Sequence, residues 1–341
     1  MLRAGIRRAA LCAAGSAPVQ RLIGSRFAGF ATILVLHQVI RGENRLLDEG
    51  LAVSEDFLDA AIDYVIRRGY LVVNLETLRR RMRDGMLSPP MVLFTFDDGY
   101  RNNLTVASKV FEKHRVPWSL YLTTGFPDRS CNYWWRALER AMIEHDRIEF
   151  DLPKLSRRYV IPSLAAKRAA YREVRGIVQE GQIEISRYLR DRYGIDERTY
   201  LDEEAMSWSD IRQLLTSEFF ELAAHTLTHP VLSALDFATA QREIADCRCR
   251  IRQALGRDVV HFAYPFGSRA AAGEREYAIC RAAGYATGAT TVQRSLHAGH
   301  AERPHALPRI WLDGRNERLS QLDIHLSGLT GLRSGMARSA T

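Results

Sequence analysis

The sequence has no apolar run of about 18 residues, so it predicts no membrane-spanning helix. It also has no zinc-finger spacing and no RNA-binding signature, so no nucleic-acid partner is expected. The few cysteines form an odd, scattered set without the pattern of a disulfide framework: Cys12, Cys131, Cys247, Cys249 and Cys280. This favours a reducing compartment and a structural role for the thiols.

The N-terminal segment, residues 1–30, lacks a convincing export signal. Its apolar stretch Ala9–Ala14 is too short for a signal-peptide core, and Arg21 and Arg26 soon follow. The net charge of +8 and the pI of about 9.4 suit an anionic surface. Two interpretations of this segment remain. It is either a basic amphipathic segment that lies on an anionic membrane, or a leader without stable structure. We expect a cytoplasmic protein with peripheral membrane contact.

The remaining sequence alternates between strand and helix patterns. At 341 residues it suffices for one large α/β domain with an insertion, or for two domains. Continuous apolar runs predict buried strands at 31–36, 70–73, 91–96, 116–123, 219–224, 259–264, 285–289 and 307–312. Capped or periodic segments predict helices at 55–68, 74–83, 104–113, 207–215, 236–255 and 270–283. This alternation favours a parallel sheet or barrel.

Two parts depart from that alternation. Residues 128–205 are charged and predict a helical insertion between barrel strands, either a lid or surface for a large substrate or a solvated hairpin without a direct role. The tail after Gly314 is expected to be peripheral. The predicted domains are therefore the basic segment 1–30, a barrel at 31–313 with the insertion at about 128–205, and the tail 314–341.

The strand that begins at Met91 ends on two carboxylates, Asp97 and Asp98, followed by Gly99. In parallel β/α architectures, the carboxyl ends of strands carry the chemistry. Because neighbouring side chains point in different directions, the two aspartates can take different roles at one site. The alternative is an ordinary Asp-Gly turn.

A pair of histidines, His225 and His229, directly follows another predicted strand. With an aspartate from a nearby strand end they would supply three ligands and leave coordination positions open, as catalytic zinc requires. The same ligand set suits non-haem iron. Those iron sites usually carry the first histidine and the acid close together, whereas here the aspartate lies far upstream.

Three motifs together resemble a known family. Thr95–Gly99, His225–His229 and Tyr264–Gly267 resemble, in order, the first three motifs of the polysaccharide deacetylases, which are carbohydrate esterase family 4 or the NodB homology domain. The resemblance covers about residues 31–312 outside the insertion. It implies a distorted (β/α)7-type barrel and metal-dependent removal of acetyl groups from N-acetylated sugars.

The resemblance also implies roles for individual residues. Asp97 would be the catalytic base, and Asp98, His225 and His229 would be metal ligands. The backbone N–H of Phe266 would stabilise the oxyanion, a role that survives the change from the more usual tyrosine. The implied cofactor is a divalent metal, zinc in the first place, with cobalt or another divalent ion as alternatives.

The sequence departs from the family pattern at an arginine–aspartate pair. Ala263 stands where the third motif often has arginine, and its partner motif, an Asp followed four residues later by Trp, is absent. Arg309, on a late predicted strand, is a candidate for orienting Asp97 instead. The alternative is an ordinary surface arginine.

The usual late Leu-x-His motif, which carries the general acid, is also missing. The stretch Ile33–Val39 resembles the Tyr-His-x-Val opening of a subgroup that includes poly-N-acetylglucosamine deacetylases, in which the last motif is permuted to the N-terminus. This makes His37 the candidate acid. The alternatives are His297, His300 and His305.

The predicted function is metal-dependent hydrolysis of the acetamide of N-acetylhexosamine units in a polysaccharide, oligosaccharide or lipid-linked glycan, as in exopolysaccharide biosynthesis. Two alternatives stay open: a sugar deformylase on the same fold, or a catalytically impaired glycan-binding protein. The second is disfavoured because a pure binding protein gains little from a free carboxylate beside a metal.

Overall fold

The computed structural model describes residues 28–43, 46–131, 133–179 and 182–331. The predictions for Cys12 and for most of the basic segment 1–30 lie outside these residues. Within them, no helix combines the length and the apolar character needed to cross a bilayer.

The strands are β1 (Ala31–Leu36), β2 (Gln38–Ile40), β3 (Ala52–Ser54), β4 (Leu71–Val72), β5 (Met91–Asp98), β6 (Trp118–Leu122), β7 (Arg147–Leu152), β8 (Leu155–Val160), β9 (Phe220–Ala224), β10 (His261–Ala263), β11 (Thr287–Ala289) and β12 (Ile310–Trp311). The α-helices are α3 (Glu55–Arg67), α4 (Leu75–Arg83), α5 (Ser108–His114), α6 (Trp134–Glu144), α7 (Leu164–Val178), α8 (Gln182–Tyr193), α9 (Glu197–Glu204), α10 (Trp208–Leu214), α11 (Phe237–Leu255), α12 (Glu274–Ala282) and α13 (Leu319–Leu326).

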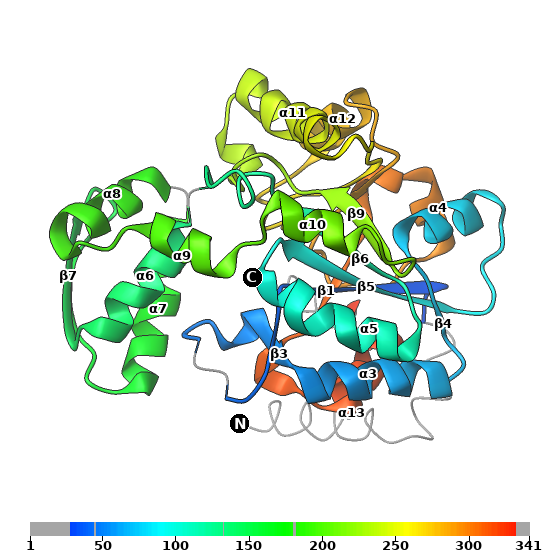
Figure 1. Ribbon diagram of the computed structural model, residues 1–341, viewed down its shortest axis with the longest axis horizontal. Helices are drawn as coiled ribbons and strands as arrows, with labels where there is room; N and C mark the ends of the chain where they lie inside the picture. Colours follow the sequence, from blue (N-terminus) through cyan, green and yellow to red (C-terminus); the bar gives the residue numbers. More distant parts are fainter. Residues whose placement is uncertain (1–27, 44–45, 132, 180–181, 332–341) are drawn as a thin grey trace, which may run out of the picture.

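The main sheet is a curled, all-parallel half-barrel. Its strand order is β11-β10-β9-β6-β5-β1-β12, and β4 pairs with the first residues of β5. A parallel bridge between Ala289 and Leu307, just before β12, brings the two sheet edges together. Helices cover the outside of the sheet (Figure 1). The predicted distorted (β/α)7-type barrel is confirmed.

Strand β5 is buried on both faces, which explains its unbroken apolar sequence. Val92, Phe94 and Phe96 belong to the main core, which also holds residues of α3 and α5. Met91 and Leu93 belong to a second apolar cluster with residues of the neighbouring strands. Because side chains alternate along a strand, Asp97 lies on the same face of β5 as Met91 and Leu93.

The insertion forms a separate lobe beside the barrel (Figure 1) with its own apolar core. It contains α6–α9, as expected, but also an antiparallel hairpin of β7 and β8. The expectation of a purely helical insertion was therefore wrong for residues 147–160. The reason is a strand-like alternation in β7, where Ile148 and Phe150 are buried between more exposed polar neighbours.

The chain after Gly314 is not peripheral as far as it is described. Helix α13 contacts α3, and its Leu322 and Leu326 are buried in the main core. These leucines are four residues apart, so they share one helix face. The predicted boundary at residue 313 was therefore wrong. Residues 332–341 lie outside the described part.

Candidate active site

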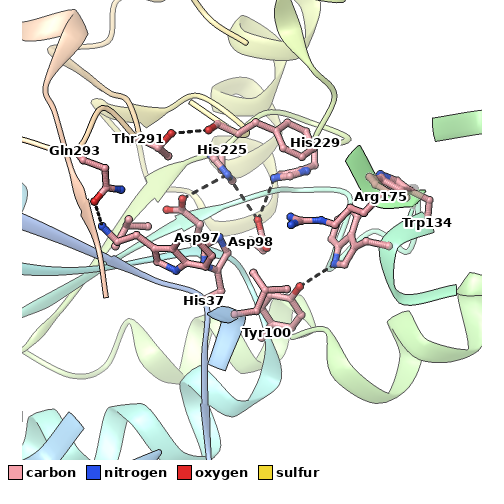
Figure 2. Close-up of a pocket in the computed structure, with 15 residues that line it drawn as sticks. His37, Asp97, Asp98, Tyr100, Trp134, Arg175, His225, His229, Thr291 and Gln293 are labelled. Atoms are coloured by element: carbon pink, nitrogen blue, oxygen red, sulfur yellow. Dashed lines mark hydrogen bonds and ion pairs between the residues drawn. The ribbon is translucent and has the colours of Figure 1, made fainter. Parts of the chain in front are cut away.

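The residues that the sequence predicts for the site meet at one end of the barrel. They line a cavity of about 250 Å³ (Figure 2) and are His37, Asp97, Asp98, His225, His229 and Phe266. Each comes from the carboxyl end of a parallel strand or from the loop after it, and such strand ends share one edge of the sheet. The sheet topology therefore assembles the site.

Asp98, His225 and His229 are placed to hold a cation. Their ligand atoms all lie within 4.8 Å of one another, and Asp98 Oδ1 is 3.3 Å from His229 Nε2 and 3.7 Å from His225 Nε2. His225 Nδ1 lies 2.8 Å from the carbonyl oxygen of Ala263. A proton on Nδ1 would satisfy that carbonyl and leave Nε2 as a ligand. Asp98 Oδ1 is buried without a hydrogen-bond partner among the described residues, so these residues fit a divalent metal.

The electrostatics of these three residues also suit a cation. Burial lowers the pKa of His225, and burial together with His225 and His37 holds the pKa of His229 well below its usual value. Both imidazoles are therefore neutral at pH 7 and can offer lone pairs. Burial, with the charge of Asp97, raises the pKa of Asp98 well above its usual value. A positive ion at this position would stabilise the Asp98 carboxylate.

Backbone strain is concentrated around the same cavity. Asp98, Thr226, His229 and Phe266 have φ angles of 76°, 69°, 63° and 60°. Non-glycine residues rarely adopt this left-handed region, and they persist there only where the surroundings fix them. The strained turns direct the strand-end side chains toward one another.

Glu243 of α11 holds the histidine loop in place. Its Oε2 accepts hydrogen bonds from the N–H groups of Leu227 and Thr228, both at 2.9 Å, and its Oε1 accepts from the Thr228 hydroxyl at 2.7 Å. These residues lie between the two histidines. No pattern in the sequence indicates this role, because Glu243 is one acidic residue among other charged residues on a polar helix.

Asp97 is paired with Arg309. Arg309 Nη1 donates to Asp97 Oδ1 at 2.6 Å and Nη2 to Oδ2 at 2.8 Å, while Nε donates to the Thr290 carbonyl at 3.1 Å. Arg309 is 0% exposed, which excludes the surface-arginine alternative. Burial raises the pKa of Asp97, but the positive charge of Arg309, together with its hydrogen bonds and the nearby His225, outweighs burial and holds the pKa at about 2.

His37 is the one of the four candidate acids that lines this cavity. Its Nδ1 is buried without a hydrogen-bond partner among the described residues, and burial lowers its pKa to about 4. His305 instead contacts the Tyr285 carbonyl oxygen at 2.8 Å, and His297 and His300 line a different cavity. The geometry therefore favours His37 over the alternatives.

Replacing His37 by glutamine is expected to preserve metal content but to lower kcat by about 10²-fold or more, the usual contribution of a general acid. His300→Gln, at a half-buried residue that lines the other cavity, is the matched control and should keep full turnover. Metal analysis and acetate release measure the two properties. Full turnover in the His37 variant would exclude it as the acid.

Several cavity residues were not predicted from the sequence. They are Val35, Leu51, Tyr100, Trp134, Trp135, Arg175, Thr291, Gln293 and Trp311. The insertion supplies Trp134, Trp135 and Arg175, so it has a direct place at the site. The Trp135 ring lies 5.2 Å from the His229 ring, and its Nε1 donates to the Tyr100 hydroxyl at 3.1 Å. The adjacent tryptophans were the available signal, whereas Arg175 stood among many arginines.

The curled barrel and the carboxylate–histidine cluster at its strand ends define the class as an α/β-barrel hydrolase with a candidate metal centre. The family model described as Polysaccharide deacetylase matches residues 84–287, which is more than half of the chain. The chain belongs to the polysaccharide deacetylase family, hydrolases that act on the amide bonds of acetylated sugars. No curated protein matches it in sequence.

Solved structures share the fold at low identity. The Streptococcus pyogenes deacetylase PplD, in complex with acetate, is 15% identical with a TM-score of 0.57, covering 86% of this chain and 96% of its own. IcaB from Ammonifex degensii is 16% identical with a TM-score of 0.55, covering 88% and 98%. The de-N-acetylase from Aggregatibacter actinomycetemcomitans is 13% identical with a TM-score of 0.56, covering 86% and 98%.

Proposed function

We propose that this protein is a metal-dependent N-deacetylase of an N-acetylhexosamine in a glycan or a lipid-linked precursor. The proposal rests on one observation: the two adjacent aspartates, Asp97 and Asp98, have different partners. Asp98 lies with His225 and His229 in a ligand set, while Asp97 is held apart by Arg309. An acetamide is a poor electrophile, and its hydrolysis needs both an electrophilic catalyst and a base.

Asp98, His225 and His229 would hold the divalent ion, with zinc as the first candidate. When bound, such an ion supplies Lewis acidity that polarises the amide carbonyl and acidifies water. Asp97 takes the proton of the attacking water. Arg309 fixes the carboxylate of Asp97 in place, and at pH 7 its low pKa keeps it ionised and able to accept that proton.

Two further groups complete the proposed reaction. The Phe266 N–H makes no hydrogen bond within the described residues, and Phe266 lines the cavity. It is therefore free to donate to the oxyanion. His37 protonates the leaving amine. Since its pKa is about 4, it is neutral at rest. The proton that Asp97 takes from the attacking water passes to His37 and from there to the leaving amine.

The sugar deformylase remains the second candidate, because the same groups would hydrolyse a formamide. Cytoplasmic action at an anionic membrane, on a lipid-linked sugar, is our proposal for the setting. It is supported by the basic balance of the chain, with a net charge of +8.

The deciding experiment measures acetate release from short N-acetylglucosamine oligomers by protein stripped of metal and then reloaded with zinc or cobalt. We expect no release from the stripped protein and recovery on reloading. Asp98→Asn should lose metal and activity together. Formate release from N-formylated sugars, without acetate release, would favour the deformylase. Full activity in the stripped protein would exclude the metal-dependent mechanism.

A further inference from the structure

The insertion brings a positive charge to the cavity. Arg175, on α7, lines the cavity, and Figure 2 shows its guanidinium directed toward Asp98 and His229. Because Arg175 lines the same cavity as the candidate catalytic residues, it can contact the sugar ring bound there or a group attached to that ring.

Arg309 and Arg175 differ in how many of their guanidinium N–H groups already have a hydrogen-bond partner. All three nitrogens of Arg309 donate to Asp97 or Thr290, and the side chain is 0% exposed. The Arg175 side chain is 32% exposed, and its ion pair joins Nη1 to Asp48 Oδ2 at 2.7 Å. Its Nε is buried without a hydrogen-bond partner among the described residues. A guanidinium has five N–H donors in a planar fork that suits carboxylate and phosphate oxygens. Arg175 therefore keeps donors available for a ligand.

The cavity is small and is partly lined by aromatic side chains. Its volume of about 250 Å³ lies below the range of drug-sized pockets. Trp134 and Trp135 of the insertion and Trp311 of β12 contribute to its lining. We infer that it takes one sugar ring at a time and that Arg175 sets which sugar is accepted.

We propose that Arg175 binds an anionic group, a phosphate or a carboxylate, on the N-acetylated sugar or directly attached to it. The substrate class is then an anionic N-acetylhexosamine, such as a sugar phosphate, a diphosphate-linked sugar or an N-acetylated uronic acid. This deepens the proposed function and rests on it. Arg175 is a specificity residue, because the proposed hydrolysis uses other groups.

The chain offers a matched control on the same helix. Arg168, seven residues before Arg175, pairs with Glu49 at 2.9 Å, so both arginines join α7 to neighbouring acidic residues of the barrel lobe. Arg168 does not line the cavity. Arg168→Gln therefore tests the loss of a comparable ion pair without loss of the proposed anion contact.

Asp48→Asn separates anion binding from a structural role. If the Asp48–Arg175 pair only fastens the insertion, removing either partner should have the same effect. If Arg175 binds the substrate, removing Asp48 releases its guanidinium and should preserve or strengthen anion binding. The two accounts therefore predict opposite effects for one variant.

The experiment compares kcat/KM of the metal-loaded wild type, Arg175→Gln, Arg168→Gln and Asp48→Asn on four substrates. These are neutral di-N-acetylchitobiose, N-acetylglucosamine 1-phosphate, uridine diphosphate N-acetylglucosamine and N-acetylglucosaminuronic acid. We expect the wild type to favour an anionic sugar. Arg175→Gln should raise the KM for it about tenfold, which corresponds to about 1.4 kcal/mol. Its kcat/KM should fall less on the neutral sugar than on the anionic one, so that the anionic preference of the wild type is lost. The preferred anionic substrate distinguishes phosphate from carboxylate.

A neutral preference in the wild type, an equal loss on neutral and anionic sugars in Arg175→Gln, or the same loss in Asp48→Asn would each overturn the proposal while leaving the deacetylase intact. If no substrate releases acetate, the proposed function fails instead. In that case, the anion site is tested by calorimetry, which compares the affinities of the protein for glucosamine 1-phosphate and for glucosamine. Tighter binding of the phosphate, lost in Arg175→Gln and kept in Arg168→Gln, supports it, and equal binding of both ligands excludes it.

Discussion

Asp97→Asn is expected to lower kcat by about 10²- to 10⁴-fold, the range associated with loss of a general base. The asparagine keeps the shape of the side chain but cannot take the proton of water. The proposed metal ligands Asp98, His225 and His229 are unchanged, so the metal content should stay at the wild-type level. Kinetics of acetate release, with metal content measured on the same samples, test this expectation.

The neighbouring Asp98→Asn is the natural comparison. It should lose both metal and turnover, whereas Asp97→Asn should lose only turnover. Equal metal loss in both variants would show that Asp97 is itself a ligand. The division of roles between the two aspartates would then be wrong, although both carboxylates would still belong to the site.

The position of the site follows from local sequence patterns. Buried parallel strands are continuous apolar runs, and β5 ends on Asp97 and Asp98 where such a run stops. His225 follows β9 in the same way. Since all strands of the main sheet are parallel, these ends must meet at one edge, and the sequence could therefore predict which residues converge.

The walls of the cavity could not be predicted in the same way. The sequence offered the pair between Asp97 and Arg309 only as one of two alternatives, because the two residues are 212 positions apart and a lone arginine just before a two-residue strand carries no periodic signal. Arg175 reaches the cavity from a lobe that packs around its own core. Such contacts depend on how separately folded parts dock, which local hydrophobic patterns do not specify. The β7–β8 hairpin, in contrast, could have been predicted, because the alternation of apolar and polar residues in β7 is present in the sequence.

Arg309→Met is the second change with a large expected effect, on stability as well as activity. It leaves the buried Asp97 carboxylate without its partner, a loss that typically costs about 3–5 kcal/mol of unfolding free energy. Urea denaturation measures this cost. The double variant Asp97→Asn with Arg309→Met should recover part of it, since no uncompensated charge remains.

The pH dependence separates the positioning role of Arg309 from a purely structural one. In the wild type, the pKa of Asp97 is about 2, below its usual value of 3.8. The stabilising contribution of its ionisation is therefore complete above pH 3.8 and is lost as the pH falls toward 2. Without Arg309, burial dominates and raises the pKa of Asp97, so the acid limb of kcat/KM should move to higher pH. Arg309→Lys keeps the positive charge but not the two parallel hydrogen bonds to Asp97, so its acid limb should move less. This variant replaces Arg309→Met in the experiment if the methionine variant does not fold. An unchanged acid limb in both variants would show that Arg309 does not lower the pKa of Asp97.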